Sequence, residues 1–153
     1  MFEKIRKRFN VHPTNQNIGI RGTLTLTGRD KNGKVLWVKH VKNLITNAGF
    51  DFICAVIGNP TQPGKITHMA IGSGVVGDAT ATTLTTESQR VAATYAHTAG
   101  TKTCTFTSTF TTVSAATEYG LLNNSTGGTL LNTAGFPAIT VDSLEIVATL
   151  TLS

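Results

Sequence analysis

The sequence is poor in charged residues, in aromatic residues and in long apolar runs. Only 14% of its 153 residues are Asp, Glu, Lys or Arg, and 7% are aromatic, whereas about 25% of a typical soluble domain is charged. No apolar run reaches the roughly 20 residues that a membrane-spanning helix needs. The basic start MFEKIRKRF also lacks the apolar stretch that follows in a signal peptide. These absences exclude a membrane protein, a collagen and a coiled coil.

Cysteine is equally scarce. Cys54 and Cys104 stand far apart, without the CxxC or zinc-type spacing of a metal or redox site. Each lies in an apolar pattern, where a free cysteine behaves as a small hydrophobic residue. We therefore expect both thiols to be reduced, and we exclude a secreted disulfide scaffold.

Threonine is abundant, and it alternates with apolar residues. There are 28 threonines, and every second residue from 103 to 111 is one of them. A period of two is typical of a β-strand with one face to the core. Since only one such run is long, we interpret threonine as a β-branched surface residue rather than as an ice-binding array, which needs a fixed repeat.

Turn signals divide the alternating segments into hairpins. Asp30–Gly33 and Asn124–Gly128 have the composition of tight turns. We expect hairpins over residues 21–42, 90–112 and 118–132, a strand near 66–72, a long loop after it, and a closing strand at 144–152. About eight strands at this spacing predict an all-β fold, either an antiparallel β-sandwich or a jelly-roll-like barrel. The predicted domain spans residues 21–153.

One segment, TNAGFDFICAVIGNP, predicts the only substantial helix, over residues 47–57. Thr46 or Asn47 can cap its first N–H groups, and Gly58 followed by Pro60 ends it. The i, i+3, i+4, i+7 spacing predicts that one apolar face is buried on the sheet. That face consists of Phe50, Ile53, Cys54 and Ile57.

Positive charge is concentrated at the start of the chain. Residues 1–42 hold ten of the thirteen lysines and arginines and two of the eight acids, a net charge of +8, whereas residues 43–153 carry −3. A basic arm over residues 1–20 predicts an acidic partner, and the alternative is a solvated tail that serves only solubility. Our candidate partner-binding residues are its apolar and basic side chains together with the first strand's arginine: Phe2, Lys4, Ile5, Arg6, Lys7, Arg8, Phe9 and Arg21.

The sequence offers no motif for catalysis, for a metal or for a cofactor. Gly58, Gly64 and Lys65 approximate a phosphate loop, but five residues separate the glycines, and Ile66 stands where Ser or Thr is needed. The four histidines are scattered, and the acids show no paired spacing. We expect no enzyme, no cofactor and no catalytic or metal-binding residue. We do not expect nucleic-acid binding either, because the basic region lacks interleaved aromatic residues.

Four stretches, taken in order, resemble a family of small virion structural proteins of tailed bacteriophages. They are KNLITNAGFDFI (42–53), ITHMAIGSG (66–74), EYGLLN (118–123) with GGTLLNTAGF (127–136), and the closing SLEIVATLTLS, with ESQRV (87–91) between the second and third. The resemblance covers roughly residues 34–153, and the basic start lies outside it.

The resemblance implies a non-catalytic virion protein that assembles in the host cytoplasm. A capsid decoration or cement protein is the first interpretation, with the major capsid protein or another virion subunit as its partner. A tail, collar or fibre-attachment component is the alternative from the same particle. A carbohydrate-binding module is the alternative of another class, with Trp37, Tyr95 and Tyr119 as its aromatic candidates. Because a weakly charged surface with strand edges favours association, we expect a homo-oligomer, most simply a trimer.

Overall fold

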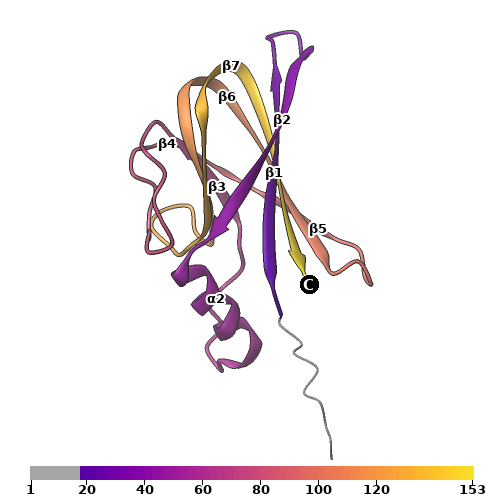
Figure 1. Ribbon diagram of the computed structural model, residues 1–153, viewed down its shortest axis with the longest axis vertical. Coiled ribbons are helices and arrows are strands. Elements are labelled where there is room, and N and C mark those ends of the chain that lie inside the picture. The colour runs from indigo at the N-terminus through magenta and orange to yellow at the C-terminus, as the bar shows by residue number, and fades with distance from the viewer. Residues whose placement is uncertain (1–17) are drawn as a thin grey trace, which may run out of the picture.

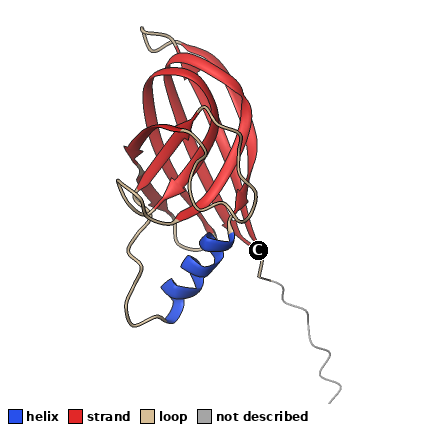
Figure 2. Ribbon diagram, turned by 90° about the vertical axis from the view of Figure 1, so that its left-hand side faces the viewer, coloured by secondary structure: helices blue, strands red, loops and turns tan. Residues whose placement is uncertain are grey.

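The computed structural model describes residues 18–153, so the arm candidates from Phe2 to Phe9 lie outside the described residues. The described chain is all-β and antiparallel, with one helix at one end of a curled sheet (Figures 1 and 2). The strands are β1 (Ile20–Arg29), β2 (Val35–Ile45), β3 (His68–Gly72), β4 (Glu87–Ala92), β5 (Thr94–His97), β6 (Thr103–Leu122) and β7 (Leu130–Leu152), and the helix is α2 (Asn47–Gly58). The predicted fold class is confirmed.

The long hairpin of β6 and β7 is the centre of the sheet. Its two strands have 20 and 23 residues, so each runs through both halves of the curled sheet. Register shifts after Val113 and after Ala116 interrupt the ladder, and Thr112 and Ala115 take positive φ angles there. Such bulges bend a strand pair and increase its twist. Each long strand therefore joins two segments that the sequence predicted as separate, and the described residues contain seven strands rather than eight.

The other strands add to the two halves of this hairpin. β1 pairs with the C-terminal half of β7, and β5 pairs with the N-terminal half of β6. On the other half, β3 pairs with the C-terminal part of β6, and β4 pairs with β3. β2 begins beside β1 and ends beside the N-terminal part of β7. The order β1-β2-β7-β6-β3-β4 follows from these pairings.

The core lies inside the curl. Phe110, Tyr119, Leu144 and Ile146 are fully buried there, and the hairpin prediction for residues 21–42 is confirmed by the β1–β2 pairing, which places Leu24 in the same core. The threonines at odd positions from 103 to 111 are exposed or half-buried, whereas Phe106, Ser108 and Phe110 are buried. The predicted alternation is therefore confirmed.

A second, smaller core lies on the outer face of β3, β6 and β7. Ala70, Leu122 and Leu130 point to this face, and Leu84 from the loop between β3 and β4 covers them. All four are buried, with exposed fractions between 0% and 6%. The predicted long loop, GSGVVGDATATTLTTES, is thus confirmed over residues 73–86, and it packs on the sheet through Leu84.

The helix begins and ends where the sequence predicts, but the predicted buried face is wrong. Phe50 is 47% exposed and Ile57 is 81% exposed, and the Cys54 side chain is exposed too, while Ile53 is half-buried. Gly49 and Phe52 are the buried residues of α2.

The cause of the rotation is a close approach at Gly49. A side chain there would collide with the backbone carbonyl of Leu131 in β7, so the helix rests on β7 through this glycine. The stripe formed by Gly49, Phe52 and Ile53 therefore faces the sheet, and the rest of α2 extends beyond the sheet's end (Figure 2).

Candidate functional site

Glu118 of β6 is the only acid that is buried among residues 18–153, and its carboxylate holds the long loop on the sheet. Oε1 accepts the N–H groups of Gly74 at 3.2 Å and Thr86 at 2.6 Å, and Oε2 accepts the N–H of Thr85 at 2.9 Å. Gly72 and Gly74 lack side chains where this carboxylate lies. Bonds from N–H groups to a charged acceptor are stronger than neutral ones. Glu118 is therefore a structural clamp with both oxygens occupied.

Arg90 of β4 makes a similar clamp at the turn between β6 and β7. Its Nε and Nη2 donate to the two carboxylate oxygens of Glu87 at 2.8 and 2.6 Å. Its Nη1 donates to the carbonyl oxygens of Asn124 and Gly127 at 2.9 and 2.8 Å. One guanidinium thus fixes the turn that closes the long hairpin.

Thr46 joins the start of α2 to β7. Its Oγ1 accepts the N–H of Gly49 at 2.9 Å, which caps the helix, and donates to the carbonyl of Leu130 at 2.5 Å. Its own N–H donates to the carbonyl of Leu131 at 3.1 Å. The Thr46 side chain is completely buried. The same hydroxyl group thus caps α2 and ties its start to β7.

Several of the stretches that carry the sequence resemblance contact one another at these three clamps, whereas the closing SLEIVATLTLS takes part in none of them. Glu118 of EYGLLN binds Gly74 of IGSG. Arg90 of ESQRV binds the carbonyls of Asn124 and of Gly127, the first residue of GGTLLN. Thr46 of KNLITNAGFDFI binds the leucines of GGTLLN. The shared order of these motifs therefore corresponds to contacts that hold distant segments together.

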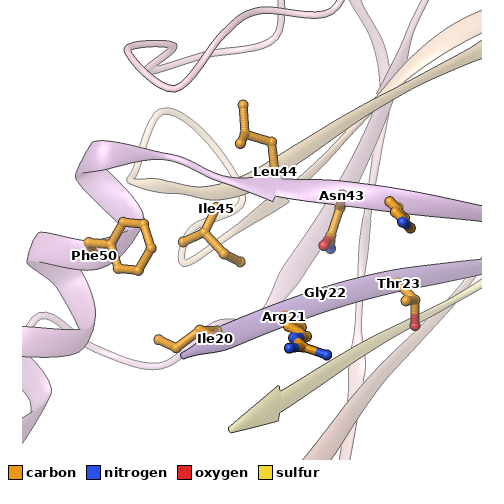
Figure 3. A pocket seen from close by; sticks show the side chains of 9 residues that line it. Ile20, Arg21, Gly22, Thr23, Asn43, Leu44, Ile45 and Phe50 are labelled. Carbon is orange, nitrogen blue, oxygen red and sulfur yellow. The ribbon is translucent and has the colours of Figure 1, made fainter. Parts of the chain in front are cut away.

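A groove lies where β1 and β2 separate, beside the first turns of α2 (Figure 3). We call this groove the fork. The last ladder pair between the two strands is Gly22 with Asn43. Beyond this pair, β1 remains paired with the C-terminal half of β7 as far as Ile20. β2 instead pairs with the N-terminal half of β7 through Ile45. The lining residues are Ile20, Arg21, Gly22, Thr23, Lys42, Asn43, Leu44, Ile45 and Phe50.

Arg21 is the one candidate partner-binding residue that the structure describes, and it lies at the fork. Its side chain is exposed on β1. Two residues earlier, the backbone of Gly19 pairs with that of Ser153. The basic arm therefore leads into the end of the molecule that holds the fork. The sequence did not predict Leu44 and Phe50 as site residues, although both are exposed apolar side chains, at 45% and 47%.

The aromatic candidates for sugar binding do not share a surface. Tyr119 is fully buried, and its desolvation raises the pKa of the phenol. Trp37 packs over Gly28 inside the β1–β2 hairpin, with the Lys39 ammonium 4.8 Å from its ring centre. Tyr95 is 57% exposed and packs against Phe106. Only one of the three rings is therefore presented to solvent.

Outside the clamps, the titratable groups of the described residues form one ion pair, between Arg29 and Glu145 at 3.8 Å. Cys54 and Cys104 are both free thiols, and half-burial raises the pKa of Cys104. Residues 18–153 contain no group of three or more His, Cys, Asp or Glu side chains placed to hold a metal ion. Over the same residues, no helix has the length and hydropathy needed to cross a membrane.

Comparisons of the chain with protein-family models, with curated proteins and with solved structures find no match.

Proposed function

We propose that this chain is a non-catalytic structural protein of a tailed-bacteriophage virion, and that it decorates and cements the capsid shell. The observation that carries the proposal is the meeting of the resembling motifs at the Glu118, Arg90 and Thr46 clamps. Motifs that serve catalysis would be expected to converge on a reactive group, whereas the side chains of these motifs bind backbone carbonyls and N–H groups. Glu118 in particular is fully buried, and each of its carboxylate oxygens accepts at least one backbone N–H.

The surface supports a binding role. Apolar side chains are exposed at the end of the molecule that holds α2, and cations are exposed beside them at the fork. Gly19, among the first described residues, lies at the same end, where it pairs with Ser153. An acidic and partly apolar surface, such as that of a major capsid protein or another virion subunit, is the partner that these features favour. We further propose that three copies associate, with the threonine-covered strands supplying weakly charged contact surface.

A count of copies in the particle tests this function. Particles of the phage that encodes this chain would be purified and their proteins quantified by mass spectrometry against the major capsid protein. A decoration protein should be present in hundreds of copies, whereas a tail or collar component would be present in a few. Absence from purified particles would overturn the virion assignment. Sedimentation of the isolated chain tests the trimer, and a monomer at micromolar concentration would count against it.

The arm is tested by loading the recombinant chain onto particles that lack it. Deletion of residues 2–10, or replacement of Phe2, Ile5 and Phe9 together by serine, should leave the fold intact, because these residues precede the described domain. If the arm anchors the protein, both variants should fail to load, and loading of the unmodified chain should weaken as salt rises. Normal loading of both variants would place the anchor on the β domain instead.

A further inference from the structure

The fork exposes two strand edges that have no strand partner on the side facing each other. Ile20 and Arg21 of β1 pair with β7 but with no residue of β2, and Leu44 and Ile45 of β2 pair with the other half of β7 but with no residue of β1. An unpaired strand edge offers N–H and C=O groups to another extended chain. The fork therefore has the backbone requirement for strand addition.

An unpaired polar side chain lies at the point where the strands separate. The Asn43 side chain projects from β2 toward β1 and lies against Gly22, which has no side chain to share the space (Figure 3). Neither Oδ1 nor Nδ2 of Asn43 has a hydrogen-bond partner, and both atoms are shielded from solvent. Buried polar groups are almost always paired. The amide thus supplies unused N–H donors and an acceptor oxygen at the closed end of the groove.

The lining of the fork specifies the chemistry of an added chain. Ile20 and Ile45 share the inward face of their strands with the core residues, and Phe50 lies opposite them on α2. Arg21 and Lys42 alternate with these positions, so both point outward. Both cations are exposed, neither belongs to an ion pair within residues 18–153, and no acid lines the groove.

We propose that the fork binds an extended segment of a partner protein in which apolar side chains alternate with carboxylates. The segment adds to the free strand edges, its apolar side chains face Ile20, Ile45 and Phe50, and its carboxylates face Arg21 and Lys42. This inference deepens the proposed function and rests on it for the identity of the partner as a virion subunit. The binding chemistry itself depends only on the fork.

A synthetic peptide tests the fork without any particle. The probe is a fluorescently labelled (Val-Glu)4 peptide, mixed with the full-length chain and followed by fluorescence anisotropy. The comparison peptides are (Val-Lys)4, which reverses the charge, and (Ser-Glu)4, which removes the apolar side chains. We expect saturable binding of (Val-Glu)4, at least tenfold weaker binding of (Ser-Glu)4, and none of (Val-Lys)4. The side-chain amide signal of Asn43 should shift in the NMR spectrum on binding.

A pair of charge-matched variants locates the binding. Arg21→Glu with Lys42→Glu reverses the fork, and Lys31→Glu with Lys34→Glu makes the same change of net charge in the exposed turn between β1 and β2. The first should weaken (Val-Glu)4 binding at least tenfold, and the second should change it less than threefold. Circular dichroism checks that both variants fold.

Two results would overturn the proposal: no binding of (Val-Glu)4 at millimolar concentration, or equal losses in both variants, which would indicate attraction to net charge alone. Because the assay contains no particle, its failure leaves the copy count in purified virions unaffected. A chain that is absent from virions but binds the peptide at the fork would overturn only the proposed function.

Discussion

On the outer face of β3 and β6, the carboxylate of Glu118 has three N–H partners, whereas at the fork the amide of Asn43 has none. The Asn132 amide of β7, which lies opposite Ile45, is also buried and unpaired. The buried carboxylate of Glu118 thus closes contacts within the chain, whereas the buried amides of Asn43 and Asn132 do not. A buried polar residue therefore stabilises the fold only where it has hydrogen-bond partners, and burial alone does not identify such a residue.

The largest effect on stability should come from removing the Glu118 carboxylate, which has three N–H partners. Glu118→Ala leaves three N–H groups without their charged acceptor, and we expect the free energy of unfolding to fall by roughly 3–5 kcal/mol. Urea denaturation followed by circular dichroism measures it. The control is Glu145→Ala, which removes an exposed ion pair with Arg29 at 3.8 Å and should cost no more than about 0.5 kcal/mol. Similar losses in the two variants would contradict the clamp.

The two faces of α2 give the next contrast. Phe52→Ala empties a buried position and should lower the free energy of unfolding by about 3 kcal/mol. Phe50→Ala, at a side chain that is 47% exposed, should lower it by less than about 1 kcal/mol. The same denaturation experiment compares them. If Phe50→Ala lowered the free energy of unfolding more than Phe52→Ala, the buried helix face predicted from the sequence would be right after all.

Gly49 tests how closely α2 approaches β7. Gly49→Ala places a methyl group against the carbonyl of Leu131, and we expect a loss of about 2 kcal/mol from the shift that this forces. Gly58, the last residue of the same helix, has open space around it, so Gly58→Ala should be neutral or slightly stabilising. Equal thermal midpoints for the two variants would show that the helix does not need this contact.

The smallest expected effect has the opposite sign. Asn132→Leu replaces a fully buried, unpaired amide by an apolar group of similar shape, and we expect the free energy of unfolding to rise by about 1 kcal/mol. The comparison is Asn123→Leu, which removes bonds to the Pro63 carbonyl and the Thr129 N–H and should be destabilising. A destabilised Asn132→Leu would mean that this amide has a partner in solution.

The elements that depend on local pattern could be predicted from the sequence. Alternation between 103 and 111 and the turn at Asp30–Gly33 require only neighbouring residues, and both predictions are confirmed. The helix boundaries are local too, because the Thr46 cap and the end at Gly58 lie within the segment itself. Local periodicity is thus sufficient for element type and for most boundaries.

The helix face and the clamps could not be predicted, because each depends on a distant segment. Two apolar stripes overlap on α2, and the choice between them is made by the carbonyl of Leu131, more than 80 residues later in the chain. Glu118 stands in a strand whose sequence gives no sign that the N–H groups of residues 74–86 will reach it. The fork has the same origin, since it forms only because β2 leaves β1 for β7. One local sign was present: Leu44 follows His40 and Lys42 on the exposed face of β2, yet it is apolar.

The pairing of β1 with β7 has a consequence for the order in which the protein can fold on the ribosome. Ile20 pairs with Leu152, so full pairing of the first described strand requires residues made more than 100 positions later. The β6–β7 hairpin, by contrast, is joined by a short turn and can form as soon as its own residues emerge. Long-range pairing of this kind slows folding and leaves strand edges open meanwhile. Until residues 143–152 have emerged, the β1–β2 hairpin has no partner on its β7 side, and nascent chains on one polysome can pair with each other at that edge.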